Sequence, residues 1–202
     1  MEADWSVEVG LGTPCIEVPW SGEGLQWVDL HNAATSLSEA CRQAVASLAL
    51  KEAQPALAAA LEQLNGPHSA WFSSKCDAWQ MNPERDADFE PLDPYEFEAE
   101  DLAHAPEPLV GFASYLDLIL IDRDKQRDLA RVEAQTRALV ASLRQAPYAQ
   151  ARVDLVLRPA LVNGTEGFAY TAYVIGCGLS AEKAAARWEQ ALHLCIETLL
   201  KR

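Results

Sequence analysis

The feature that most constrains the fold is the regular alternation of strand and helix patterns after residue 108. Residues 109–120, 151–162 and 168–176 are rich in apolar residues and read as strands, and Asn163-Gly164 between the last two predicts a hairpin. Residues 122–145 carry apolar side chains near one helical face and dense charge elsewhere. A last helix is predicted from Ser180, its expected N-cap residue. Strands and helices in this order bury their apolar faces best as a sheet covered by helices.

The first eighty residues extend the same scheme. Three short strands are predicted in "WSVEV", "CIEVPW" and "LQWVDLH", followed by helical residues 36–64 and a strand in "SAWFSSKCDAW". Pro55 is expected to begin a second helix that ends at Asn65-Gly66. The order is βββ-α-ββ-α-ββ-α, which predicts an α+β protein with a mainly antiparallel sheet and helices packed on one face. This order is compatible with a ferredoxin-like core, a comparison that concerns architecture only.

Residues 82–108 differ from the rest of the chain. They contain ten acidic residues, one arginine and five prolines, and they supply −9 of the net charge of −14. Proline at this density prevents a regular central element. The segment also holds spaced apolar residues, which favour a long loop strapped across the domain over a free linker. We therefore predict a single domain over residues 1–202, with an acidic, proline-rich loop at 82–108.

The net charge restricts the partners. A charge of −14 argues against direct binding of nucleic acid or of an anionic membrane surface, and it favours cations or basic proteins. The longest apolar run is broken by Asp117 and is too short to span a bilayer, and the first residues do not resemble a signal peptide. The five cysteines form no CxxC pair and suggest neither a disulfide framework nor a zinc site. We expect a cytoplasmic protein.

The stretch "SSKCDAWQM" (residues 73–81) raises the question of a reactive thiol. In a strand, side chains alternate between faces, which places Cys76 with Phe72, Ser74 and Ala78. A free cysteine among small and apolar neighbours behaves as a small hydrophobe. We therefore interpret Cys76 as structural and expect no catalytic residue here.

The opposite parity of the predicted strands collects charged and aromatic residues. Lys75 and Asp77 share one face of their strand, and Asp117 interrupts a very apolar strand, where burial would require a partner such as Lys75 or Arg158. The ordinary interpretation is a solvated sheet face with cross-strand ion pairs; the alternative is a binding surface. The candidate binding residues are Lys75, Asp77, Tyr115, Asp117, Arg158, Asp29 and His31.

Two further patterns are candidate ligand sites. "GCGLSA" (residues 176–181) matches the glycine pattern of a dinucleotide site, but no second strand with a ribose-binding acid follows it, so a strand-to-helix turn capped by Ser180 is favoured. A weaker alternative is an anion held there, with Cys177 of lowered pKa. Asp29 and His31 are two metal-ligand types on one predicted strand face, but a metal site needs three or four convergent ligands. We predict no cofactor and no metal.

Two hypotheses for function follow. The leading one is a non-catalytic interaction protein, whose acidic loop and aromatic-rich sheet bind a protein partner or a second copy of the chain. The alternative is a small-molecule binder or enzyme that uses the polar sheet face around Asp77 and Asp117. An acidic mimic that competes for a nucleic-acid-binding protein is a third option, distinguished by one continuous stripe of negative charge.

Overall fold

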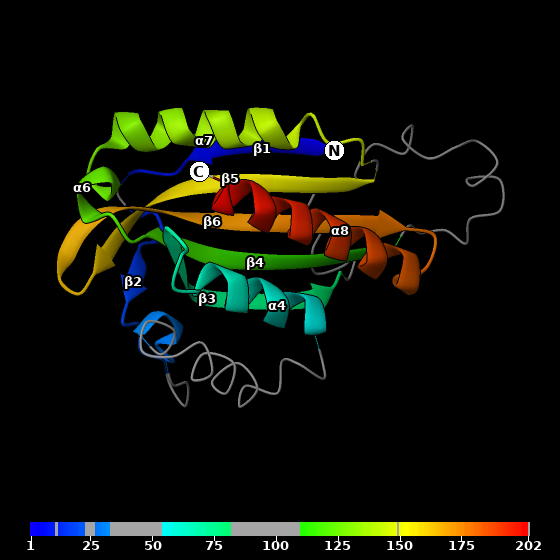
Figure 1. Cartoon of the computed structure of the whole chain (residues 1–202), viewed down its shortest axis with the longest axis horizontal. Helices are drawn as coiled ribbons and strands as arrows, with labels where there is room; N and C mark the ends of the chain where they lie inside the picture. The colour runs from blue at the N-terminus through cyan, green and yellow to red at the C-terminus, as the bar shows by residue number, and fades with distance from the viewer. Residues whose placement is uncertain (11, 23–26, 33–53, 82–109, 149, 202) are drawn as a thin grey trace.

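The computed structural model describes residues 1–10, 12–22, 27–32, 54–81, 110–148 and 150–201 (Figure 1). The acidic segment 82–108 and the predicted helical cap at Ser36 lie outside these residues. The described strands are β1 (Glu2–Val7), β2 (Ile16–Val18), β3 (Trp71–Gln80), β4 (Val110–Leu120), β5 (Ala151–Val162) and β6 (Thr165–Gly178). The described helices include α4 (Pro55–Leu64), α6 (Arg123–Gln126), α7 (Leu129–Leu143) and α8 (Ala181–Leu200).

The strands form one mixed sheet in the order β1-β5-β6-β4-β3, and β2 also pairs with β5. β5–β6, β6–β4 and β4–β3 are antiparallel, whereas β1 and β2 run parallel to β5. β4 and β5 are therefore parallel to each other with β6 between them, and the chain connects them through α6 and α7. The α+β class is confirmed. The ferredoxin-like order is not confirmed, because β6 lies between β4 and β5 and residues 27–29 form no strand.

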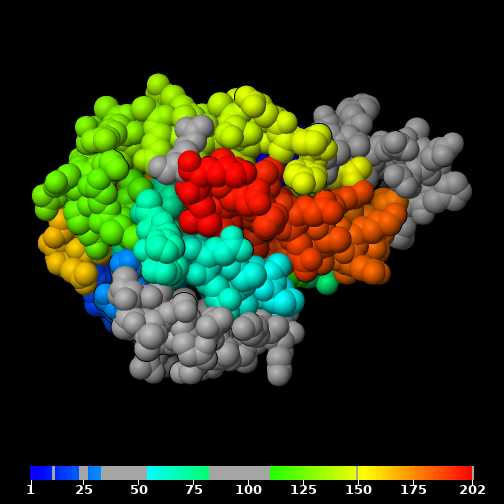
Figure 2. All heavy atoms as spheres, viewed as in Figure 1, coloured from blue at the N-terminus to red at the C-terminus, as the bar shows by residue number. Residues whose placement is uncertain are grey.

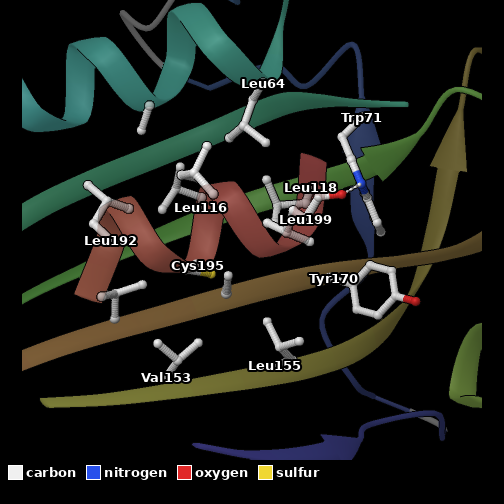
Figure 3. Close-up of a cluster of buried hydrophobic side chains, with 14 of the residues drawn as sticks. Leu64, Trp71, Leu116, Leu118, Val153, Leu155, Tyr170, Leu192, Cys195 and Leu199 are labelled. Carbon is white, nitrogen blue, oxygen red and sulfur yellow. Dashed lines mark hydrogen bonds between the residues drawn. The ribbon is translucent and has the colours of Figure 1, made fainter. Parts of the chain in front are cut away.

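Helices α4, α8 and α7 lie side by side over one face of the sheet (Figures 1 and 2). Between them and the sheet is the main core, which Figure 3 shows in part. Leu116 and Leu118 of β4 meet Leu192 and Leu199 of α8 there, as the alternation of β4 and the helical spacing of α8 require. The Nε1 of Trp71 donates a hydrogen bond to the Leu199 carbonyl (3.2 Å), which fixes the end of α8 to β3.

Local signals explain most of the element boundaries. Pro55 is the first residue of α4, and the Ser180 hydroxyl accepts from the Lys183 N–H (3.3 Å) at the start of α8, both as predicted. The β5–β6 hairpin turns at Asn163 and Gly164, which both have positive φ (51° and 76°). This conformation is the one that Asn-Gly turns favour.

Two predicted elements were wrong. Residues 27–29 form no strand; a helical turn begins at Leu30, and the Asp29 carboxylate accepts the Asn32 N–H (2.9 Å). The single helix predicted over 122–145 is two helices, because Asp122 and Asp128 each cap a separate helix start. No helix within the described ranges is long and apolar enough to cross a membrane.

Candidate binding site on the second sheet face

The sheet face opposite α4, α7 and α8, here called the second face, is divided into three zones. At one end lies a small apolar cluster that includes Phe72 and Ile119, and at the other end lies one formed around Ala113 and Ile175. Polar and aromatic side chains fill the middle. The candidate residues of this middle zone are Lys75, Asp77, Tyr115, Asp117 and Arg158, joined by Glu8, Thr171 and Tyr173.

The register places the predicted residues beside one another. Lys75 lies directly opposite Asp117, and Asp77 lies opposite Tyr115, so all four side chains project from the second face. The predicted parity is correct for these residues but wrong before them. A bulge between Ser73 and Lys75 shifts the phase of β3, so Phe72 lies on the second face and Trp71 is in the main core.

A chain of hydrogen bonds holds the centre of this zone. The Arg158 guanidinium donates from Nε to the Glu8 carboxylate (2.9 Å) and from Nη1 to Thr171 Oγ1 (2.9 Å). The Thr171 hydroxyl in turn donates to Asp117 Oδ1 (2.7 Å). Arg158 thus keeps its ion pair with Glu8 and orients the hydroxyl that fixes one oxygen of Asp117. The Asp117 Oδ2 forms no hydrogen bond to any described residue, which leaves it available to a ligand.

The environment of Asp117 disfavours its charge. Burial raises the pKa of this carboxyl above the ordinary value of 3.8, while the Thr171 hydrogen bond and the charges of Arg158 and Lys75 oppose the increase. A carboxyl that is partly buried on a sheet face and only partly compensated is costly to the fold. Such groups are enriched at functional sites.

This pKa shift predicts a pH-dependent stability. A raised folded pKa means that the folded state binds the proton more tightly, so the free energy of unfolding falls as the pH rises from about 4 through the folded pKa. In Asp117→Asn the amide oxygen still accepts from Thr171 and nothing titrates. We expect the stability difference, variant minus wild type, to become more positive between pH 4 and pH 7 in chemical denaturation. Thr171→Val removes the hydrogen bond that opposes the rise of the Asp117 pKa, so its free energy of unfolding should fall further over the same pH range. A stability difference between Asp117→Asn and wild type that does not change with pH would contradict a raised pKa of Asp117.

Aromatic rings border the carboxyl. The rings of Tyr115 and Tyr173 lie 6.4 Å apart and those of Tyr115 and Trp79 lie 6.3 Å apart, measured between centroids. Burial, followed by the charges of Asp117 and Asp77, raises the pKa of Tyr115 to about 12, so its hydroxyl stays protonated and can donate a hydrogen bond. Tyrosine and tryptophan rings beside carboxylates provide the surfaces on which cationic groups bind.

Acidic groups outnumber basic groups among the described residues of the second face. The register assigns to it Glu2, Asp4, Asp77, Asp117, Asp154 and the adjoining Glu8, against Lys75, Arg152 and Arg158. Arg152 pairs with Asp154 (2.7 Å) and with Glu2 (3.9 Å), and Arg158 pairs with Glu8 (2.9 Å). Asp4 pairs with Arg144, the C-cap residue of α7 (3.3 Å). Asp77 accepts only the N–H of Ala78 (2.8 Å), and it forms no ion pair with a described residue. The face therefore retains uncompensated negative charge.

The other candidates do not join this zone. Asp29 caps a helical turn instead of lying on a strand, and the His31 ring stacks on Phe72 with centroids 5.1 Å apart. In the parts of the chain that the structure describes, no group of three or more His, Cys, Asp or Glu side chains is arranged to hold a metal ion. The interpretation of Asp29 and His31 as residues of the strand face was wrong.

The cysteine and glycine motifs have structural explanations. Cys76 projects toward the helix layer, and burial followed by the charges of Asp77 and Asp117 raises its pKa to about 12, which keeps the thiol unreactive. Cys177 is buried with Ala113 and Ile175. Gly176 lets α8 approach the sheet closely, because a Cβ at this position would meet the Ala184 carbonyl at 2.5 Å. The GCGLSA pattern therefore serves strand-to-helix packing.

Sequence reasoning missed Glu8, Thr171 and Tyr173. In "FAYTAYVIG", Thr171 and Tyr173 are two residues apart and therefore lie on the same face of the strand. Two polar side chains on one face of an apolar strand are the signal that could have identified them. Comparisons with protein families, with curated proteins and with solved structures find no match to this chain.

Proposed function

We propose that the protein is a non-catalytic interaction module, whose second face binds a protein partner that carries basic side chains. The observation that carries this proposal is the Asp117 carboxyl beside the Tyr115 and Tyr173 rings. Thr171 holds its Oδ1, and no described residue donates a hydrogen bond to its Oδ2. A lysine or arginine side chain placed there would pair with the carboxyl and stack on the rings. The partner's charge would replace the water that burial has removed from Asp117.

The charge distribution supports a basic partner. Asp77 adds an uncompensated carboxylate next to Tyr115, and the net charge of −14 accelerates the approach of a cationic protein. The segment 82–108 follows β3 closely in the chain and carries −9 of this charge. In this proposal it contributes to long-range attraction, and the second face provides the specific contacts.

The test uses a short arginine-rich peptide as a probe in NMR titrations of the full chain. Amide shifts are expected to cluster around Tyr115, Asp117, Thr171 and Tyr173. Asp117→Asn is expected to weaken binding about tenfold, since the bound cation loses the carboxylate with which it pairs. Glu189→Gln removes a charge from the exposed side of α8 and should leave the affinity unchanged. Replacing residues 82–108 by a neutral linker should slow association without moving the binding site.

A different pattern would reject the proposal. If Asp117→Asn and Glu189→Gln lower the affinity for the arginine-rich peptide equally, the binding reflects net charge alone and the second face is not a specific site. The small-molecule alternative rests on a separate observation, the raised pKa of Asp117 beside Lys75 and Tyr115, an arrangement suited to acid-base chemistry. A metabolite whose thermal stabilisation is lost in Asp117→Asn would favour that alternative.

A further inference from the structure

We propose that the outer edge of β3, from Lys75 to Gln80, binds an extended peptide of a partner protein by strand addition. The peptide would carry a basic residue opposite Asp77, with an apolar residue on each side of it. In this mode of recognition, main-chain hydrogen bonds give affinity and alternate side chains give specificity.

β3 is an edge strand of the sheet. It pairs with β4 on one side and with no other described strand. Before the bulge, side chains satisfy its outward amides: the Trp71 N–H donates to Ser69 Oγ (3.0 Å), and the Ser73 N–H donates to Asn65 Oδ1 (3.1 Å). At the bulge, Trp20 Nε1 donates to the Ser74 carbonyl (2.8 Å). The edge is therefore closed up to Ser74 by other groups of the chain.

Beyond the bulge the edge is different. The Met81 N–H donates to the Gly111 carbonyl (2.9 Å), which sets the phase in which alternate residues of β3 bond to β4. Cys76 and Ala78 therefore direct their backbone groups away from β4. The Ala78 N–H is bonded to the Asp77 carboxylate, as a substitute for a neighbouring strand, and the Cys76 N–H and carbonyl find no partner among the described residues. Unpaired backbone groups in a row are a template for another strand.

A hollow of about 430 Å³ lies along this part of the edge. Its lining includes residues from both sides of the sheet: Val28, Leu30, Leu57 and Leu61 toward the helix layer, and Lys75, Asp77 and Tyr115 toward the second face. Ser74, which is 9% exposed, also lines it, and the Ser74 hydroxyl is a buried polar group without a hydrogen-bond partner. Buried hydroxyls are normally bonded, and a polar group of a bound peptide would supply the partner of this one.

The two sides of the hollow specify the peptide. A residue opposite Asp77 would project on the second face, where an arginine or lysine meets the uncompensated carboxylate. Its two neighbours would lie opposite Cys76 and Ala78 and project toward Leu57 and Leu61, which favours valine or isoleucine. Trp20 borders this stretch on one side, and Leu57 and Leu61 of α4 border it on the other. A single extended peptide therefore fits here better than the broad sheet edge of a second copy of the chain.

This site adds a recognition mode to the proposed function, and the two can fail separately. The peptide uses Asp77 and the β3 backbone, whereas the proposed partner contact uses Asp117. Asp117→Asn is therefore expected to weaken the arginine-rich probe more than the edge peptide, whereas Asp77→Asn is expected to weaken the edge peptide more.

The experiment uses a fluorescein-labelled peptide with a Thr-Val-Arg-Val-Thr core and its Thr-Val-Glu-Val-Thr counterpart, titrated against the full chain. We expect the wild type to prefer the arginine peptide about tenfold, and Asp77→Lys to reverse the preference. Glu189→Lys makes the same charge change on α8 and should keep the wild-type preference. Saturating arginine peptide should slow hydrogen exchange of the Cys76 amide. In an antiparallel addition, methylating the nitrogen of the valine opposite Cys76 should abolish binding, whereas methylating the arginine nitrogen should not.

Several results would overturn the proposal. These are no binding of the arginine peptide, equal affinity for the two methylated peptides, or a Cys76 amide that is already protected in the free protein. A monomer–dimer equilibrium that the peptide displaces would assign the edge to a second copy of the chain instead.

Discussion

Gly176→Ala is expected to destabilise the protein by about 3 kcal/mol or more, at the upper limit of ordinary overpacking effects. Gly176 lies in β6 beneath α8, and an added Cβ would lie 2.5 Å from the Ala184 carbonyl oxygen and against the backbone nitrogen of Trp188. Both are backbone atoms of α8, so no side-chain rotation relieves the contact. The helix would have to lift from the sheet, which would open the main core. Urea denaturation of the purified variant measures the effect.

The matched control is Gly10→Ala. A Cβ on Gly10 would have only the Thr13 methyl group near it, at 4.0 Å. We expect its stability to stay within about 0.5 kcal/mol of the wild type, as for most exposed positions. Equal losses in the two variants would show that the loss at Gly176 does not come from the approach of α8 to β6, because the chain-entropy effect of replacing glycine by alanine is stabilising.

The elements that the sequence predicted correctly are those whose burial repeats over many residues. The alternation in β4 and the stripe of Trp188, Leu192, Cys195 and Leu199 in α8 each extend over several turns or pleats, so a single exception does not change the period. The residues from Trp27 to His31 are too few for this. An aspartate between apolar residues fits a strand, but it also fits a helix cap, and the Asn32 N–H decides for the cap.

The sequence predicted which β3 residues share a face of the candidate site, but it did not predict which residues of different strands lie beside one another. Parity placed Lys75 and Asp77 on one face because the two residues follow the bulge, and the same reasoning failed for Trp71 because an extra residue intervenes. The pairing of Lys75 with Asp117 depends on a register between segments separated by the whole acidic region. No local pattern encodes that register. Glu8 reaches Arg158 only because β1 lies parallel to β5, a neighbour relation that chain order does not reveal.

Trp188→Ala is expected to cost about 3–5 kcal/mol of unfolding free energy, the range for large buried aromatic residues. Trp188 is 1% exposed, its ring lies 4.7 Å from that of Phe112 between centroids, and its Nε1 donates to Ser114 Oγ (2.8 Å). The alanine variant therefore loses packing in the core and also leaves the Ser114 hydroxyl buried without its donor. Guanidinium denaturation followed by circular dichroism measures the loss, because it does not depend on tryptophan fluorescence.

Trp188→Phe separates the two contributions. Phenylalanine keeps most of the ring packing but cannot donate to Ser114, so we expect a smaller loss, about 1–3 kcal/mol, dominated by the unpaired hydroxyl. In the Trp188→Phe variant, Ser114→Ala removes the unpaired hydroxyl and should recover part of the lost stability. In the wild type, Ser114→Ala removes a hydroxyl that accepts a hydrogen bond and should destabilise the protein. If Ser114→Ala has the same effect in both backgrounds, the hydrogen bond contributes nothing, and packing alone explains why a tryptophan occupies this position in the core.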